Sequence, residues 1–425
     1  GFYYKTFMWP PKFWKKYEYF IRKAAGLGKS PTEDDPDQYE HFHYHCDILV
    51  VGGGISGMYA AELAAKSNLK VLLLEQKSKA GGEINNDPDT WFEPVAGEAI
   101  DNLPARLFDE IYANIKRLNN VKIVTDTTVF AYMHHNYLLA CQKTNGSNIR
   151  QIIWKIRAKK VVLATGSVER PLTFHNNDRP GIMLSHSARQ YANRSCDLGK
   201  NIVIFTNNDY AYQTAIDFKL LDTFIKVTIV DLRNNSKGDL IQEAKDLGVH
   251  ILFNHIITNT KGRKKINSVF VHKIDEKTNE IINIYGKISC DLLCVSGGWT
   301  PTVHLFTQSR GKLIYRDSDA TFIPHKSFQD EMSVGACNGT FDLNNILDET
   351  YNKISKFLSE FEKNIEKRSF INFSKINKTF YDKMKHLWII PSDRHFGKTK
   401  MFVDFQNDVT AKDIKLALKE GYKSI

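Results

Sequence analysis

The stretch that decides the fold is CDILVVGGGISGMYAAELAAKSNLKVLLLEQ, residues 46–76. Residues 48–51 form an apolar run that is long enough for a buried parallel strand. The run leads into G-G-G-I-S-G, which satisfies G-x-G-x-x-G with Gly52, Gly54 and Gly57. In this pattern the first glycine permits a tight turn, the second lets a pyrophosphate approach the backbone, and the third lets a helix pack closely on the strand.

The residues after the glycines complete a strand–helix–strand unit. The helix expected from residue 57 to about residue 66 is rich in alanine, and its N-terminus offers free N–H groups to phosphate. A second apolar strand, residues 71–74, ends at Glu75, where a carboxylate can accept hydrogen bonds from ribose hydroxyls. A glycine-rich turn with no ligand is the alternative. Because the first strand, the glycines, the helix, the second strand and its terminal acid all agree, the stretch predicts a dinucleotide site.

Composition limits the class of protein. The 425 residues suffice for two or three domains, and 42% of them are hydrophobic, so sizeable cores can form. No apolar run approaches the roughly 20 residues of a membrane span, and no signal peptide follows Gly1, so we expect a cytoplasmic protein or a fragment of a longer one. The net charge of +10 is spread along the chain without a nucleic-acid module, which favours a mildly basic surface and neither nucleic-acid nor membrane partners.

The cysteine pattern excludes several redox and metal chemistries. None of the six cysteines forms C-x-x-C, which argues against a thioredoxin-like disulfide, a zinc ribbon and an iron–sulfur site. Cys290 and Cys294 lie four residues apart in an expected strand, about 13 Å, too far for a disulfide. We therefore expect mostly reduced, structural thiols and no metal site.

A second strand–helix–strand unit lies in residues 199–233. Here Thr206, Asn208 and Ala211 stand where the first unit has its glycines, and their Cβ atoms would crowd a pyrophosphate. The sequence therefore predicts a second dinucleotide-type domain whose own site is degraded. Thr165 and Gly166 end an earlier strand where the backbone can pass close to a nucleotide, and the small residues around Gly335 are a further candidate contact.

These patterns predict an α/β fold with two nested Rossmann-like domains, the layout of the glutathione reductase and thioredoxin reductase superfamily. The expected order is an aromatic and basic arm over residues 1–45, either packed on the body or used for docking, and a first domain over residues 46–170, completed by residues 290–345. The second domain is inserted at residues 171–289. Residues 346–425 form a helical or irregular segment, which we expect to be the start of a truncated domain.

More specific stretches resemble the α subunit of heterotetrameric sarcosine oxidase. They include FYYKTFMWP, RKAAGLG, DILVVGGGISGMYAAELA, VTDTTVFAY, VLATGSVERPLTFHNNDRPGIML, FTNNDYAY and FVDFQNDVTAKDIKLALKEGYKSI. The resemblance covers the central part of that subunit, without its N-terminal ferredoxin-like and C-terminal folate-binding domains. It implies an NAD-binding subunit that works with β, γ and δ subunits, of which β carries FAD and covalent FMN. The family demethylates sarcosine to glycine, yielding formaldehyde or methylene-tetrahydrofolate together with hydrogen peroxide.

The resemblance also implies site residues. Together with the glycines, Glu75, Thr165, Gly166 and Gly335, the residues expected to contact the nucleotide are Ser56, Gln76, Lys77, Glu83, Val129, Ala336, Phe341 and Leu343. Glu83 departs from the small hydroxyl residue expected at its position. Asp404, Phe405 and Gln406 stand where some relatives place a cysteine cluster, so we expect no iron–sulfur centre.

Other functions remain open at this stage. One is a self-sufficient FAD-dependent NAD(P)H oxidoreductase, although it would need two working nucleotide sites or a redox disulfide. Others are a subunit of the related amine-oxidising and cyanide-forming dehydrogenases, and a nucleotide-binding scaffold without a role in turnover. No residue of the chain is assigned a catalytic role.

Overall fold

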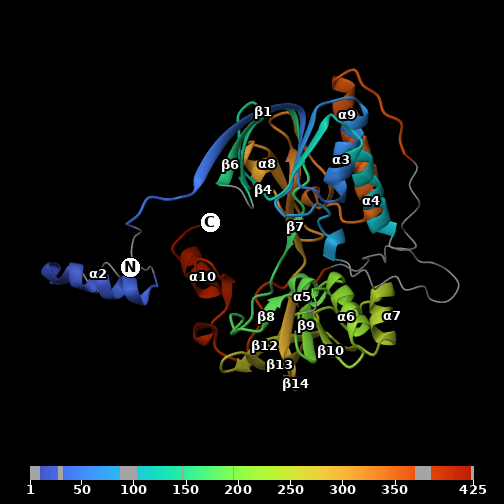
Figure 1. Ribbon diagram of the computed structural model, residues 1–425. Helices are drawn as coiled ribbons and strands as arrows, with labels where there is room; N and C mark the ends of the chain where they lie inside the picture. Colours follow the sequence, from blue (N-terminus) through green and yellow to red (C-terminus); the bar gives the residue numbers. More distant parts are fainter. Residues whose placement is uncertain are drawn as a thin grey trace.

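The computed structural model describes residues 10–26, 32–86, 103–144, 148–194, 196–368 and 384–422. Two α/β units lie one above the other in Figure 1 and are joined by a narrow crossing near β7 (Ser167–Glu169). The predicted fold class is therefore confirmed, since each unit contains a parallel sheet that alternates with helices along the chain.

The first unit is built around a sheet in the order β3-β2-β1-β6-β5-β4, with β19 also paired to β6. Strands β3, β2, β1, β6 and β19 are parallel, whereas β4, β5 and β6 form an antiparallel meander. The strands are β1 (Gln38–Val51), β2 (Val71–Leu74), β3 (Val121–Val124), β4 (Thr127–Met133), β5 (Tyr137–Lys143), β6 (Ile149–Leu163) and β19 (Glu331–Ser333).

Helices cover one face of this sheet. Figure 1 shows α3 (Ile55–Lys66), α4 (Leu103–Lys116) and α9 (Leu343–Glu360) side by side, and their apolar residues share one core with Ile48, Val50 and Val162. The other face packs against the meander and α8 (His304–Gln308). Short elements complete the unit: η2 (Ile84–Asn86), η4 (Gly335–Asn338), β17 (Lys312–Arg316) and β18 (Thr321–Lys326).

The second unit has a parallel sheet in the order β11-β10-β9-β15-β8. One face packs against the helices, and the other against the antiparallel sheet β12-β13-β14. Its elements are β8 (Ile182–Leu184), α5 (Ser185–Ala192), β9 (Asn201–Thr206), α6 (Tyr210–Leu221), β10 (Lys226–Asp231), α7 (Asp239–Asp246), β11 (His250–Phe253), β12 (His255–Gly262), β13 (Ile266–Ile274), β14 (Ile281–Ser289) and β15 (Leu292–Ser296).

Two domain boundaries differ from those expected from the sequence. Strand β1 begins at Gln38, inside the stretch assigned to the arm, because residues 38–46 pair with the first half of the long strand β6. Strand β15 lies in the second sheet, paired with β9, although residues 290–345 were expected to complete the first domain. The return to the first unit therefore occurs after β15, at β16 (Trp299–Pro301).

The ends of the described chain lie beside the two units. Helix α2 (Trp14–Ala24), preceded by η1 (Pro11–Phe13), has no buried residue and stands apart from the body in Figure 1. At the other end, η6 (Phe396–Lys398), β20 (Phe402–Asp404) and β21 (Val409–Thr410) precede α10 (Ala411–Lys419). The Asp413 carboxylate accepts hydrogen bonds from the Thr410 amide (2.8 Å) and hydroxyl (2.6 Å), which caps the N-terminus of α10.

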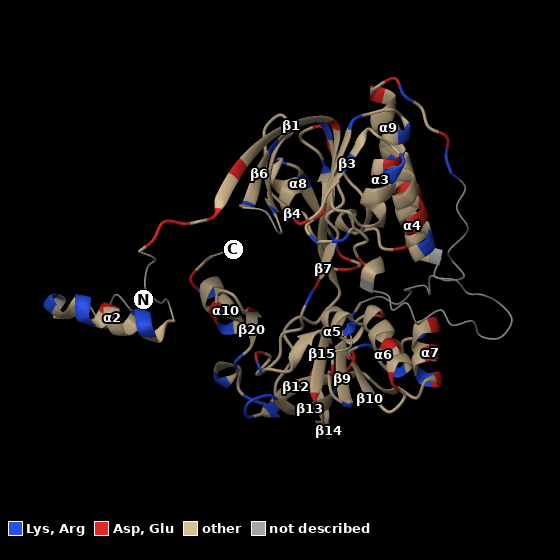
Figure 2. Cartoon of the chain, viewed as in Figure 1, with Lys and Arg blue, Asp and Glu red and all other residues tan. Residues whose placement is uncertain are grey.

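Charge is distributed over the whole molecule. Figure 2 shows Lys and Arg on α2, on α10 and on elements of both units. No helix of the described residues is long and apolar enough to cross a membrane. All six cysteines are free thiols, and Cys290 and Cys294 are both buried.

The crossing between the units contains a buried carboxyl group. Strand β7 (Ser167–Glu169) pairs with β16, and Glu169 is only 8% exposed. Burial raises the pKa of Glu169 to about 7, although the Ser296 hydroxyl and the amide of His186 oppose the shift. The amide of His186, at the start of α5, donates a 2.8 Å hydrogen bond to this carboxyl group.

We predict that Glu169 makes the stability of the protein depend on pH. Because the pKa is raised in the folded state, the folded protein binds the proton more tightly than the unfolded chain. Stability should therefore fall as the pH rises from about 4.5 to about 7, by roughly 2–3 kcal/mol. Relative to the wild type, Glu169→Gln should gain stability by this amount between about pH 5 and about pH 8.

Urea denaturation at the two pH values measures this difference. Glu40→Gln, which removes an exposed carboxylate from β1, is the control for the loss of a charge. A constant offset between Glu169→Gln and the wild type at both pH values would contradict the prediction.

Candidate dinucleotide site

Two glycines of the first unit are required by the packing of the protein itself. Gly52 has φ +106°, and a Cβ there would lie 2.2 Å from the carbonyl oxygen of Ala164 at the end of β6. A Cβ on Gly57 would lie 2.0 Å from the carbonyl oxygen of Gly52. Helix α3 therefore sits so close to the turn after β1 that no side chain fits between them.

Gly54 differs from these two glycines. Its backbone (φ −71°, ψ −179°) is one that any residue adopts, and a Cβ there would meet no atom of the described residues within 4 Å. Gly54 is also the N-cap of α3, and no side chain caps this helix in the described part of the chain. The absence of a side chain thus leaves open space beside a helix N-terminus, which is the environment that a pyrophosphate requires.

Glu75 lies beside the glycine loop. Its carboxylate accepts hydrogen bonds from the backbone amides of Gly53 (2.6 Å) and Lys77 (2.7 Å), and the residue is only 6% exposed. Each carboxylate oxygen has a second lone pair, so both can still accept from a ribose hydroxyl. Gln76 and Lys77 follow Glu75 and are exposed.

A second pair of glycines contacts the loop from the other side. The amide of Gly81 donates to the carbonyl of Gly53 (2.8 Å), and a Cβ on Gly82 would lie 3.1 Å from the Cα of Gly54. Both residues have positive φ. Sequence reasoning did not assign these two glycines to the site, although paired glycines are the signal that could have done so.

Ser56 and Gly335 meet at the start of α3. Gly335 has φ +71°, and a Cβ there would lie 2.6 Å from the Ser56 hydroxyl. The amide of Gly335 donates to Glu349 of α9 (3.2 Å), and Ala336 follows within η4. Gly335 therefore lies against the first turn of α3, beside the glycine loop, and the contact of these residues with a nucleotide stays a prediction.

The remaining candidates lie farther along this edge or face elsewhere. Thr165 donates its hydroxyl hydrogen bond to the carbonyl of Thr302 (2.8 Å), and Gly166 has φ +70° with open space at its Cβ position. Val129 is half-buried on β4. Leu343 is buried in the helix-side core, so its side chain serves packing.

Glu83 and Phe341 turn towards the second unit. The Glu83 carboxylate lies 3.1 Å from Nε2 of His186 and 3.4 Å from a guanidinium nitrogen of Arg189, both on α5. The Phe341 ring lies 6.0 Å from the ring of Tyr210, at the start of α6. Their side chains thus connect the two units, which position in the sequence alone did not indicate.

The corresponding loop of the second unit is filled by its own side chains. Nδ2 of Asn208 donates to the carbonyl and the hydroxyl of Ser296 (both 3.2 Å). Oδ1 of Asn208 accepts from the amide of Tyr210 (3.0 Å), the first residue of α6. An internal side chain therefore occupies the helix N-terminus that a phosphate would use.

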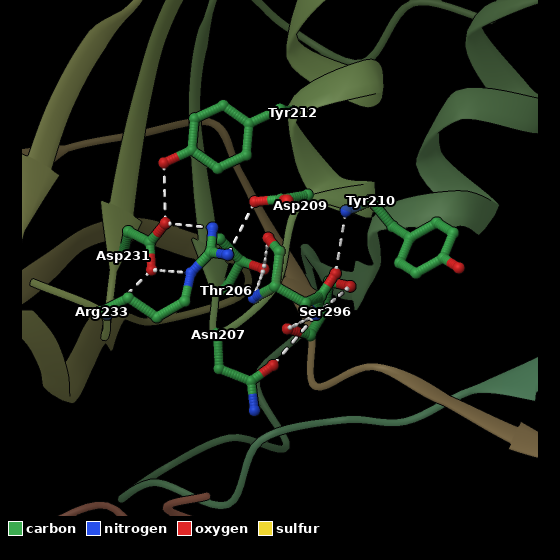
Figure 3. Close-up of polar contacts among 9 residues, drawn as sticks. Thr206, Asn207, Asp209, Tyr210, Tyr212, Asp231, Arg233 and Ser296 are labelled. Atoms are coloured by element: carbon green, nitrogen blue, oxygen red, sulfur yellow. Dashed lines mark hydrogen bonds and ion pairs between the residues drawn. The ribbon is translucent and has the colours of Figure 1, made fainter. Parts of the chain in front are cut away.

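The acid at the end of β10 is also engaged (Figure 3). Asp231 is fully buried and accepts hydrogen bonds from the Arg233 guanidinium (2.8 and 3.1 Å) and the Tyr212 hydroxyl (2.7 Å). Arg233 also lies 2.6 Å from Asp209. Burial alone would lower the pKa of Arg233, but the two aspartates raise it above its ordinary value. Sequence reasoning missed Arg233, because its role depends on contacts within the folded loop.

The fold and the first glycine loop define the class of protein. Residues 46–320 match the pyridine nucleotide-disulphide oxidoreductase family. Because this match covers more than half of the chain, the chain belongs to that family. In addition, residues 398–425 match the sarcosine oxidase A3 domain.

Among the individual proteins that are similar to this chain are α subunits of sarcosine oxidase. The chain is 33% identical over 435 residues to sarcosine oxidase subunit alpha of Rhizobium meliloti (strain 1021), covering 100% of this chain and 41% of that protein. It is 32% identical over 419 residues to the same subunit of Corynebacterium sp. (strain U-96), covering 94% and 41%. The chain therefore spans about two fifths of the length of these relatives.

Solved structures show the same fold at lower sequence identity. L-proline dehydrogenase from P. horikoshii has a TM-score of 0.53 and 22% identity, covering 80% of this chain and 59% of that chain. Thioredoxin reductase from T. acidophilum has a TM-score of 0.53 and 19% identity, covering 75% and 98%. Among the described residues, no group of three or more His, Cys, Asp or Glu side chains is placed to hold a metal ion.

We predict that Gly54→Ala impairs ligand binding but not folding. The new Cβ enters open space, so the thermal unfolding midpoint should match that of the wild type. The same Cβ excludes a pyrophosphate, so dinucleotide affinity measured by calorimetry should fall at least about tenfold, or about 1.4 kcal/mol.

Gly57→Ala is the matched comparison. Its Cβ meets the carbonyl oxygen of Gly52, so it should destabilise the fold by roughly 1–3 kcal/mol, as overpacking does. Unchanged dinucleotide affinity in a folded Gly54→Ala protein would show that the ligand does not use this loop.

Proposed function

We propose that this chain is the NAD-binding part of the α subunit of a sarcosine oxidase. The complex would demethylate sarcosine to glycine, with formaldehyde or methylene-tetrahydrofolate and hydrogen peroxide as the other products. Substrate oxidation would take place on a partner β subunit that carries FAD and FMN, within a heterotetramer that also contains γ and δ subunits. The observation that supports this proposal best is the contrast between an open first glycine loop and a filled second one, in a chain similar to these subunits along its whole length.

A self-sufficient FAD-dependent NAD(P)H oxidoreductase is the main alternative. Such an enzyme passes electrons between two nucleotides or through a disulfide. Against it stand the side chains that fill the second loop and the six free cysteines, which form no C-x-x-C motif. A scaffold without a role in turnover, or a subunit of a related amine-oxidising or cyanide-forming dehydrogenase, would share the same open loop.

The residues of the first site fit a dinucleotide. The pyrophosphate would lie beside Gly54 at the N-terminus of α3, and one ribose would bind Glu75. A bound NAD supplies a hydride acceptor. Glu75 disfavours NADP, because a 2′-phosphate beside a carboxylate is repelled, an effect that Lys77 can soften. The local chemistry accepts the ADP half of FAD as well, and the similarity to sarcosine oxidase favours NAD.

The identity of the nucleotide is directly testable. Denaturing the purified chain and separating the released nucleotide by chromatography, with its absorbance spectrum, should yield NAD. Glu75→Ala should weaken NAD binding by roughly 1–3 kcal/mol, the range for a hydrogen bond to a charged group. Glu83→Ala is the comparison, and a smaller loss is expected because its carboxylate faces α5. Stoichiometric FAD in the released fraction would favour the reductase instead.

The second test concerns catalytic competence. The isolated chain should produce no sarcosine-dependent hydrogen peroxide, because no residue of it is assigned as the base and oxidation is proposed to occur on the partner. Co-expression with a candidate FAD-binding β subunit should restore peroxide formation in a coupled peroxidase assay. Robust turnover by the isolated chain would contradict the proposal that substrate oxidation takes place on the partner subunit.

A further inference from the structure

Residues 384–390, here called the strap, cross the second unit at the loop where a domain of this type would bind a nucleotide. The amide of Lys385 donates to the carbonyl of Asn207 (3.3 Å), and Nδ2 of Asn207 donates back to the carbonyl of Lys385 (3.0 Å). Asn207 belongs to the loop after β9, the same loop that corresponds to the glycine loop of the first unit. The strap is therefore bound directly to the degraded loop.

The strap also reaches the loop after β15. A Cβ on Gly298 would lie 2.9 Å from the sulfur of Met384, and Arg170 donates a 3.5 Å hydrogen bond to the same sulfur. The Arg170 guanidinium stacks over the Trp388 ring at 4.7 Å. Strands β9 and β15 are neighbours in the sheet but distant in sequence. The crevice beyond the ends of such strands is the place where doubly wound sheets bind ligands.

The end of the strap is built into the second unit. Residue Ile389 forms a parallel bridge with Thr173. The amide of Thr173 donates to the carbonyl of Trp388 (3.2 Å), and the amide of Ile390 donates to the carbonyl of Thr173 (2.8 Å). Ile390 is 1% exposed within the core between the two sheets of this unit. Backbone pairing and apolar burial thus hold the strap in one position.

A second anchor follows ten residues later. The side chain of Asn177 pairs with the backbone of Phe402 in both directions, donating to its carbonyl (2.8 Å) and accepting from its amide (2.9 Å). The amide of Asn176 donates to the carbonyl of Lys400 (2.7 Å). Both asparagines belong to the segment that leads from the crossing into the second unit, and Asn177 is buried.

We propose that the second unit binds a segment of its own chain, residues 384–402, in place of a nucleotide. The strap lies across the ligand crevice, and the side chains of Asn208 and Arg233 fill the loop beneath it. The ligand that this unit recognises is an extended peptide, held by backbone hydrogen bonds and by two apolar side chains, Trp388 and Ile390. The unit thereby fixes the start of the segment that matches the sarcosine oxidase A3 domain. This proposal does not depend on the nucleotide held by the first unit.

Hydrogen exchange followed by mass spectrometry on the whole chain tests the proposal. Trp388→Ala removes the stack on Arg170 and the packing beneath the strap, so the amides of Thr173, Lys385 and Ile390 should exchange about tenfold faster or more. Leu416→Ala is the matched control, since Leu416 is an exposed apolar residue of α10 at 56% exposure. It should leave exchange at these amides unchanged.

Adding NAD or NADPH at millimolar concentration distinguishes a strap that permanently replaces a nucleotide from a movable segment that a nucleotide displaces. Exchange in the strap of the wild type should stay the same with either nucleotide, whereas NAD should protect residues 52–57. Faster exchange in the strap on adding either nucleotide would overturn the proposal, because the crevice would then still bind a nucleotide. Unchanged exchange in Trp388→Ala would overturn it as well. A lack of protection at residues 52–57 alone would count against NAD binding and leave the strap proposal standing.

Discussion

The contact on which the first unit depends is the close approach of α3 to the backbone at the end of β1. The carbonyl oxygen of Gly52 occupies the space where a side chain on Gly57 would lie, and the carbonyl oxygen of Ala164 does the same for Gly52. These contacts join β1, α3 and β6 within a few residues. As a result the N-terminus of α3 points past Gly54 into open space, and the glycine loop, Glu75 and Gly335 come to lie around one position.

The second unit has the same architecture, but its own side chains fill the loop that corresponds to the glycine loop. Oδ1 of Asn208 accepts from the Tyr210 amide, the helix N-terminal donor that a pyrophosphate would use, and Nδ2 of Asn208 donates to Ser296. Asp231 is bound by Arg233 and Tyr212. Buried charges are costly unless they are paired, so the two aspartates beside Arg233 make that residue tolerable inside the unit. A loop stabilised in this way no longer needs a ligand, and its outer surface is available to the strap.

The crossing between the units is more than a linker. The Trp299 ring lies 5.2 Å from that of His186 and 6.0 Å from that of Tyr210, which in turn contacts Phe341 of the first unit. The Glu83 carboxylate reaches Arg189 and His186 nearby. Residues beside the first nucleotide loop are therefore in contact with the second unit. These contacts tie the position of the second unit to the edge of the first site, and Arg170, directly after β7, contacts Met384 and Trp388 of the strap.

The sequence by itself determined the fold class, and it predicted a nucleotide site at the first glycine loop, which stays a prediction. Glycine spacing and apolar runs are local features, because each depends on residues within a turn or two of one another. The same reasoning predicted a degraded loop at Thr206–Ala211 from the side chains that it carries. Tertiary structure alone decided the extension of β1 to Gln38 and the place of β15, because both follow from pairing with β6 and β9, strands distant in sequence. It also decided that Glu83 and Phe341 face the second unit and that the strap lies over Asn207. The direction of a side chain across an interface depends on which surfaces meet, and no pattern within a single stretch of sequence contains that information.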